Sequence, residues 1–188
     1  PAEEPPSGDP AAVVIKQGYI DMLEGTKLAY SVALPSATGR FPEAFASAGY
    51  CEGADPYCND ATNAHALVAA GYAVLGVNIR DTGCSTGTFD VFTPQESADG
   101  AAAIAWAALQ EWSNGRVGMF GDSFPGITQM GVAAQRPPHR RAIAPGQCTT
   151  EPYRDIGYPG GIANVGFGAF WAGINRPMAA YSGGLQQA

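Results

Sequence analysis

The sequence predicts an α/β fold in which a mostly parallel sheet is covered by helices on both faces. Apolar runs alternate with segments of helical pattern along the chain, and this order is typical of parallel strands joined by crossover helices. The run at 72–78 is continuously apolar rather than alternating, as in strands that are buried on both faces. A third observation, a serine placed between an apolar strand and a helix at 116–130, indicates where the chemistry lies.

The chain opens with a hairpin pattern. Residues 13–20 and 27–34 have the pattern of strands, and the turn-forming pair Glu24-Gly25 lies between them. Pro35 ends the second strand. Residues 42–48 are short and apolar and form the next candidate strand. We therefore expect an antiparallel pair ahead of the parallel part of the sheet.

A helix and a buried strand follow. Asn59 or Asp60 can cap a helix that stops at Gly71, because asparagine and aspartate satisfy the first backbone N–H groups and glycine favours the end. The strand at 72–78 comes next. It ends in the stretch 80–88, which is rich in turn formers and is expected to be a loop.

The second half of the chain repeats the alternation. Thr93 can cap a helix that has Pro94 at its first position. The expected elements are a helix from Thr93 to Glu111, a strand at 116–120, a helix to about Arg136 and a strand at 141–144. After Pro145 the pattern changes, because glycine-spaced aromatic residues show neither strand nor helix periodicity. This indicates the start of a separate covering segment at 150–188.

Length and composition fit one domain. Of 188 residues, 46% are hydrophobic, which is enough for a substantial core. The net charge is −7 and no basic run is present, so we expect neither nucleic acid nor a membrane as a partner. No apolar run approaches the roughly 18 residues needed to span a bilayer.

Residues 1–12 form a polar, proline-rich leader that we expect to be flexible. They lack the basic and apolar segments of a signal peptide. A leader of this kind is typical of the mature end of exported proteins. We therefore favour a secreted protein, with a cytoplasmic one as the alternative.

The four cysteines, Cys51, Cys58, Cys84 and Cys148, allow three disulfide pairings. Cys51 and Cys58 lie in one loop, where a local bridge is the simplest pairing. Cys84 and Cys148 both follow predicted strands and could meet at one edge of the sheet, while four buried thiols are the alternative. The spacings do not match a zinc site, and we expect no metal and no cofactor.

Ser123 lies where a strand turns into a helix. Residues 116–120 read as a buried strand, Gly121 follows, and a helical pattern begins directly after the serine. A turn of this kind, called a nucleophile elbow, lifts the hydroxyl clear of the strand ends, where a base can reach it. The common pattern G-x-S-x-G is altered, because Pro125 takes the second glycine's place and Gly126 follows it. Proline in the first turn of a helix removes no hydrogen bond, so the geometry is retained.

Four segments carry a family resemblance over roughly 18–171. They are Gly71-Tyr72-Ala73-Val74, the loop 77–87, the elbow 117–126 and Ala142-Ile143-Ala144-Pro145. Together they resemble the cocaine esterase and Xaa-Pro dipeptidyl-peptidase family of serine hydrolases, a branch of the α/β-hydrolases. The resemblance implies an α/β-hydrolase fold that is incomplete in this chain. Residues 13–149 would be its N-terminal part and residues 150–188 the start of its helical cap.

The resemblance also implies the roles of three residues in catalysis. Ser123 would be the nucleophile, and the backbone N–H of Phe124 would be one oxyanion donor. The family usually has tyrosine where this chain has Phe124. The hydroxyl of Tyr50, just after the third strand, matches the family's second oxyanion donor, and a tyrosine that only covers the core is the alternative.

Arg80 matches the arginine of the family's D-x-R-G loop. Asn78 replaces the usual aspartate of that motif, and Asp81 replaces its glycine. We expect Arg80 to pair with a carboxylate and brace the loop, with contact to substrate as the second interpretation.

A general base for Ser123 is not evident in the sequence. In α/β-hydrolases the triad histidine follows the serine and the acid along the chain. His139 should lie at the far end of the helix after Ser123, and His65 falls within an earlier helix. We therefore expect the histidine, the acid and the remaining strands to come from a C-terminal remainder of the same protein, as a continuation or a second chain.

These observations predict a serine hydrolase that cleaves an ester or amide bond of a small molecule or peptide through an acyl-enzyme. An esterase or acylase is favoured over an Xaa-Pro dipeptidyl-peptidase, because no site for a peptide's amino terminus is evident. A non-catalytic binding module with the same fold is the alternative from another class. The absence of a G-x-G-x-x-G motif after an early strand argues against a dinucleotide-binding protein.

Overall fold

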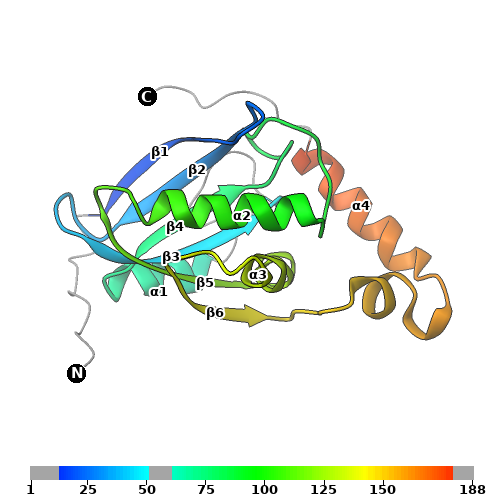
Figure 1. Cartoon of the computed structure of the whole chain (residues 1–188). Helices are drawn as coiled ribbons and strands as arrows, with labels where there is room; N and C mark the ends of the chain where they lie inside the picture. The colour runs from blue at the N-terminus through cyan, green and yellow to red at the C-terminus, as the bar shows by residue number, and fades with distance from the viewer. Residues whose placement is uncertain (1–12, 51–60, 180–188) are drawn as a thin grey trace.

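The computed structural model describes residues 13–50 and 61–179. These form one six-stranded sheet with the strand order β1-β2-β4-β3-β5-β6 (Figure 1). The strands are β1 (Val14–Asp21), β2 (Lys27–Leu34), β3 (Phe41–Ala48), β4 (Ala73–Asn78), β5 (Ser113–Asp122) and β6 (Arg140–Gly146). The expected leader 1–12, the helix cap at Asn59 or Asp60, the pair Cys51 and Cys58, and residues 180–188 lie outside the described residues.

The sheet is mostly parallel, which confirms the prediction. β1 and β2 form the expected antiparallel hairpin, with Val14 opposite Leu34, and β2 also runs antiparallel to β4. The pairs β3–β4, β3–β5 and β5–β6 are parallel. The parallel strands therefore end at the same edge of the sheet, where open α/β sheets bind their ligands.

Helices cover both faces of the sheet, as predicted. The helices are α1 (Ala61–Ala69), α2 (Pro94–Ala107), α3 (Phe124–Ala134) and α4 (Val165–Ala179). On one face, Val68 of α1 lies in a buried cluster with Val74 of β4. On the other face, Ile104 of α2 and Val132 of α3 share a larger cluster with Leu75 of β4. Successive residues of β4 thus serve two cores, which explains its continuous apolar run.

α2 ends earlier than predicted. The sequence pattern placed its end at Glu111, but the helix stops at Ala107. Turns follow it, with hydrogen bonds of 3.0 Å from the Gln110 N–H to the Ala107 carbonyl and from the Ser113 N–H to the Gln110 carbonyl. The chain reverses here so that Trp112 is buried with 6% of its surface exposed. Burial of the indole therefore outweighs the helical propensity of this segment.

The segment after β6 is helical and projects beyond one end of the sheet (Figure 1). It contains a π-helical turn at Tyr153–Gly157, a 3₁₀ turn at Pro159–Gly161 and the helix α4. The glycine-rich sequence showed no helical period, so α4 was not predicted from its pattern. Val165 and Phe170 of α4 are 76% and 64% exposed. This surface is largely apolar and is not covered by the described residues.

The two described cysteines, Cys84 and Cys148, form no disulfide with each other; Cys84 is buried and Cys148 is exposed. None of the helices in 13–50 and 61–179 is long and apolar enough to cross a bilayer.

Candidate active site

Ser123 occupies a strained turn between β5 and α3. Its backbone angles are φ 62° and ψ −120°, a conformation that residues other than glycine rarely adopt. Three backbone hydrogen bonds hold the turn: the Ser123 N–H donates to the Gly146 carbonyl at 3.1 Å, and the Gly126 and Ile127 N–H groups donate to the Ser123 carbonyl at 2.9 and 2.8 Å. The Ser123 side chain is exposed at the carboxyl edge of the sheet. The geometry matches the elbow that the sequence predicts.

Close packing around the elbow explains its glycines. A Cβ on Gly126 would lie 2.1 Å from the Gly146 carbonyl oxygen, so α3 could not begin so near the end of β6. Gly121 has φ +132°, and a Cβ there would lie 2.6 Å from the Cβ of Pro125. Gly126 is therefore the glycine that lets the helix approach the sheet, although it is displaced by one position from the common pattern.

The two expected oxyanion donors flank Ser123. Phe124 is the first residue of α3, where backbone N–H groups have no partner within the helix and face outward from its N-terminus. Tyr50 follows β3 and packs edge-on against the Phe124 ring, with ring centroids 5.6 Å apart and planes at 69°. The structure thus brings Tyr50, Ser123 and Phe124 together.

These three residues line one cavity of about 320 Å³. Its walls are aromatic: Phe92 lies with its ring centroid 4.9 Å from that of Phe124, and Trp171 of α4 stacks on Phe124 at 6.4 Å and 11°. None of the described residues that line this cavity carries a charge. The sequence did not identify Phe92 or Trp171 as site residues, because only the fold brings them to Ser123. The glycine-spaced aromatics after 158 were the available signal.

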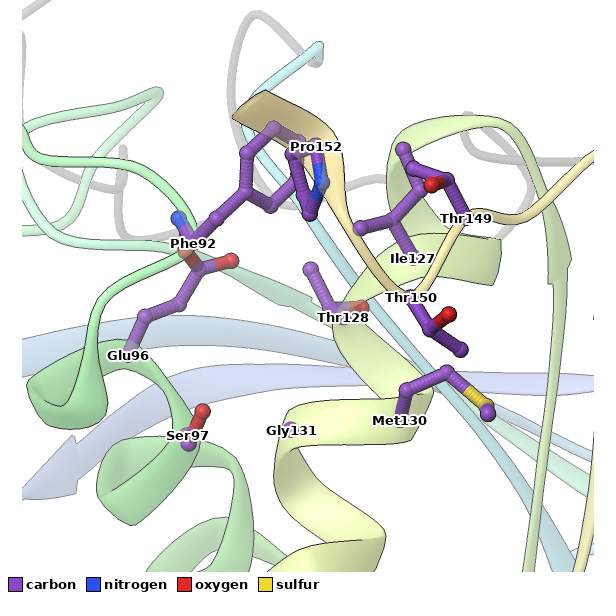
Figure 2. A pocket seen from close by; sticks show the side chains of 10 residues that line it. All are labelled: Phe92, Glu96, Ser97, Ile127, Thr128, Met130, Gly131, Thr149, Thr150 and Pro152. Atoms are coloured by element: carbon purple, nitrogen blue, oxygen red, sulfur yellow. Dashed lines mark hydrogen bonds between the residues drawn. The ribbon is translucent and has the colours of Figure 1, made fainter. Parts of the chain in front are cut away.

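Figure 2 shows the lining of a second, smaller cavity of about 280 Å³, which shares Phe92, Ile127 and Pro152 with the first. Figure 2 shows the Glu96 side chain reaching back towards Phe92. The Phe92 N–H donates to Glu96 Oε2 at 2.5 Å, and the Glu96 N–H donates to the Thr93 hydroxyl at 3.2 Å. This reciprocal cap fixes the start of α2 and thereby the Phe92 wall. Burial raises the pKa of Glu96 to about 7, and the nearby Phe92 N–H opposes the shift.

Arg80 braces two segments rather than facing the aromatic cavity. Its guanidinium contacts the Asp99 carboxylate twice, from Nε to Oδ2 at 2.6 Å and from Nη2 to Oδ1 at 2.9 Å. It also donates to Glu24 at 3.1 Å and to Thr26 at 3.2 Å. The hydrogen bonds to Asp99 hold the pKa of Arg80 above its usual range. Asp81 has an exposed side chain and φ 56°.

Neither histidine lies at the elbow. His139 precedes β6 and its Nδ1 lies 3.2 Å from the Gly115 carbonyl oxygen, near the start of β5. Ser123 follows the other end of β5, so His139 is at the opposite edge of the sheet, as predicted. His65 is exposed on α1. Among the described residues, no group of three or more His, Cys, Asp or Glu side chains could hold a metal ion.

Comparisons with known proteins agree on one family. The family model described as X-Pro dipeptidyl-peptidase (S15 family) matches residues 24–186. The chain is 32% identical to the cocaine esterase of Rhodococcus sp. over 148 residues, which is 78% of this chain and 26% of that protein. It is 28% identical to a Mycobacterium bovis protein named as a serine esterase, over 85% of this chain and 28% of that protein. The chain therefore spans less than a third of the length of these curated relatives.

A solved structure supports the same grouping. The crystal structure of a CocE/NonD family hydrolase from Staphylococcus aureus superposes with a TM-score of 0.80 and 26% identity, over 93% of this chain and 35% of that one. Crystal structures of more distant esterases share the fold, such as acetyl xylan esterase 1 of Thermoanaerobacterium with a TM-score of 0.61. The α/β-hydrolase fold is thus confirmed for the described part of the chain.

Proposed function

The chain belongs to the X-Pro dipeptidyl-peptidase (S15) family, and we propose that it supplies the nucleophile and the oxyanion donors of a serine hydrolase. The enzyme cleaves an ester or amide bond through an acyl-enzyme. One observation carries the proposal above all others: Ser123 is held at φ 62° and ψ −120° with its hydroxyl exposed beside Tyr50 in a cavity. Strain of this kind persists where surrounding packing enforces it, and it clusters at sites of function.

Each group at the elbow has a task in the reaction. Ser123 Oγ attacks the substrate carbonyl carbon while a base takes its proton, and the carbonyl oxygen becomes an oxyanion. The Phe124 N–H and the Tyr50 hydroxyl donate hydrogen bonds to that oxyanion. The C–O or C–N bond then breaks, the base returns the proton to the leaving alcohol or amine, and the acyl group stays on Ser123. Water repeats the sequence and releases the acid.

The base and its acid come from outside these 188 residues in this proposal. The chain has two histidines, and both lie away from Ser123. The curated relatives are more than three times as long as the part that this chain matches. The apolar surface of α4 and the exposed side chains of β6 give a C-terminal remainder a place to pack. An intact protein of this mass with full hydrolase activity would contradict this part.

The cavity favours an apolar acyl group. Its described lining is mostly aromatic and aliphatic, with Asn164 as a polar side chain besides Ser123, and it has no carboxylate. The free ammonium group of a peptide would therefore lose hydration without a counter-charge. We therefore propose an esterase or acylase, with the Xaa-Pro dipeptidyl-peptidase activity of the family name as the second candidate. The values of kcat/KM for p-nitrophenyl esters and for Xaa-Pro p-nitroanilides, measured with the same enzyme, show which of the two activities is the greater.

A binding module without catalysis is the competing class. It predicts that Ser123→Ala leaves the biological function intact, because the cavity walls stay in place. The hydrolase predicts a loss of several orders of magnitude in kcat, since the other groups cannot replace the nucleophile. Wild-type ester turnover in Ser123→Ala would remove the proposed function.

A further inference from the structure

Trp171 touches both residues that supply the oxyanion donors. Its Nε1 lies 3.3 Å from the Tyr50 hydroxyl oxygen and donates a hydrogen bond to it. Its ring stacks on the ring of Phe124 with planes at 11°. The residue belongs to α4, more than 40 positions after the nucleophile, so a separate part of the chain reaches back to the elbow. Trp171 is partly buried there, whereas its neighbour Phe170 is 64% exposed.

The hydrogen bond between Trp171 and Tyr50 can run in one direction only, from the indole to the hydroxyl oxygen. An indole N–H can only donate, whereas a phenolic hydroxyl has one donor and two acceptor positions. The Tyr50 oxygen must therefore be the acceptor in this contact, and its own proton cannot point at the indole. That proton is left to point elsewhere, and Tyr50 shares its cavity with Ser123. Accepting a hydrogen bond also polarises the hydroxyl and strengthens the bond that it donates.

We propose that Trp171 is a positioning residue that orients the Tyr50 hydroxyl towards the oxyanion, so that α4 completes the oxyanion site. The inference rests on the proposed function and adds a residue to it. A tryptophan that only walls the cavity would change how the acyl group binds. A tryptophan that orients Tyr50 changes turnover, and only while the Tyr50 hydroxyl is present.

A double-mutant cycle tests this in the complete enzyme that carries the chain. The four proteins are wild type, Trp171→Phe, Tyr50→Phe and the double variant. Phenylalanine keeps a ring that can stack on Phe124 but removes the N–H donor. The substrate is p-nitrophenyl acetate, because a small acyl group depends little on the cavity walls. Thermal melting of each variant checks that it is folded.

Tyr50→Phe should lower kcat about 100-fold or more, as the loss of one oxyanion donor does. Trp171→Phe should lower kcat about fivefold with KM nearly unchanged, the size expected for one neutral hydrogen bond. The double variant should match Tyr50→Phe alone, because the indole has no hydroxyl left to orient. Phe167→Leu, on the same helix and in the same cavity, is the matched control, and its effect should be equal in both backgrounds.

Two results would overturn the inference. The first is that Trp171→Phe leaves kcat unchanged, or that it lowers kcat by the same factor whether or not Tyr50 has been replaced by phenylalanine. The second is a wild-type kcat in Tyr50→Phe, which would remove the oxyanion role of Tyr50 but leave a serine hydrolase intact if Ser123 still forms the acyl-enzyme. Phenylboronic acid gives a readout that needs no turnover, since it forms a tetrahedral adduct with a reactive serine. Its affinity should fall in Trp171→Phe and should show the same dependence on Tyr50.

Discussion

Arg80 and Asp99 form a two-point ion pair that joins the loop after β4 to helix α2, with N···O distances of 2.6 and 2.9 Å. The side chains are 17% and 9% exposed, so the pair is largely withdrawn from water. The parallel geometry suits the planar guanidinium and is not available to lysine. Because α2 begins next to Phe92, this pair connects the arginine loop to a wall of the Ser123 cavity.

Arg80→Met should destabilise the protein more than Asp99→Asn does. Methionine leaves the buried Asp99 carboxylate without its cation, whereas Asp99→Asn leaves Arg80 paired with Glu24. We expect Arg80→Met to lower the free energy of unfolding by about 2 kcal/mol, the scale of hydrogen bonds to charged groups. Urea denaturation measures both variants.

The exposed pair between Lys16 and Glu111 is the control for this comparison. Glu111→Gln should leave the free energy of unfolding unchanged within error, since exposed ion pairs contribute little. Equal effects of Arg80→Met and Glu111→Gln would show that Arg80 does not brace the fold.

Gly126→Ala should damage the elbow. The added Cβ would meet the Gly146 carbonyl oxygen at 2.1 Å, and that oxygen accepts the Ser123 N–H. The backbone on one side must move, so we expect a loss of about 1–3 kcal/mol in stability together with a loss of activity. Gly166→Ala is the control, because no atom lies within 4 Å of a Cβ added at this position. This variant should be neutral or stabilising by at most about 1 kcal/mol. A fully active, stable Gly126→Ala variant would contradict the proposed geometry.

Glu43 lies inside the sheet on β3 with 1% of its surface exposed. Neither carboxyl oxygen has a hydrogen-bond partner among the described residues. Burial raises its pKa from 4.5 to about 7, and the nearby Ser113 hydroxyl opposes the shift without forming a hydrogen bond of normal geometry. The folded protein therefore favours the protonated carboxyl, whereas the unfolded chain ionises at its ordinary pKa.

The stability that Glu43 contributes should thus be present at pH 4 and lost as the pH rises through about 7. The shift corresponds to about 3 kcal/mol between the two limits. The glutamine in Glu43→Gln cannot ionise. The free energy of unfolding of the variant minus that of wild type should therefore be larger at pH 8 than at pH 4. Urea denaturation at both values measures the difference. If the difference in free energy of unfolding between variant and wild type is the same at pH 4 and pH 8, Glu43 is not the titrating group.

The sequence pattern predicted those elements of the fold that depend on the hydrophobicity and turn preferences of neighbouring residues. The continuous apolar runs gave β4 and β5, and the strand, Gly121 and the helix after Ser123 gave the elbow. The end of α2 was wrong because Trp112 is buried by contacts that come from distant strands. The pattern missed α4, whose glycines lower helical propensity and whose Val165 and Phe170 side chains are exposed rather than packed on the sheet.

The candidate site was predicted only as far as motifs reach. Ser123, Phe124 and Tyr50 lie in motifs and meet in one cavity. Phe92 and Trp171 reach the cavity through the placement of α2 and α4. The glycine spacing of the aromatic residues after 158 marked the segment of Trp171 but not its place at Ser123, and no pattern marked Phe92. The Arg80 partner was expected to be a carboxylate, but its identity as Asp99 follows from the way α2 packs.

Labelling with a fluorophosphonate probe tests the nucleophile most directly. The probe reacts with an activated serine hydroxyl, and peptide mass spectrometry of the complete protein locates the adduct. The adduct should lie on Ser123 and should be absent from Ser123→Ala, with Ser85 and Ser97 unmodified in both proteins. An unmodified Ser123 in folded, complete protein would contradict the assignment of this residue as the nucleophile.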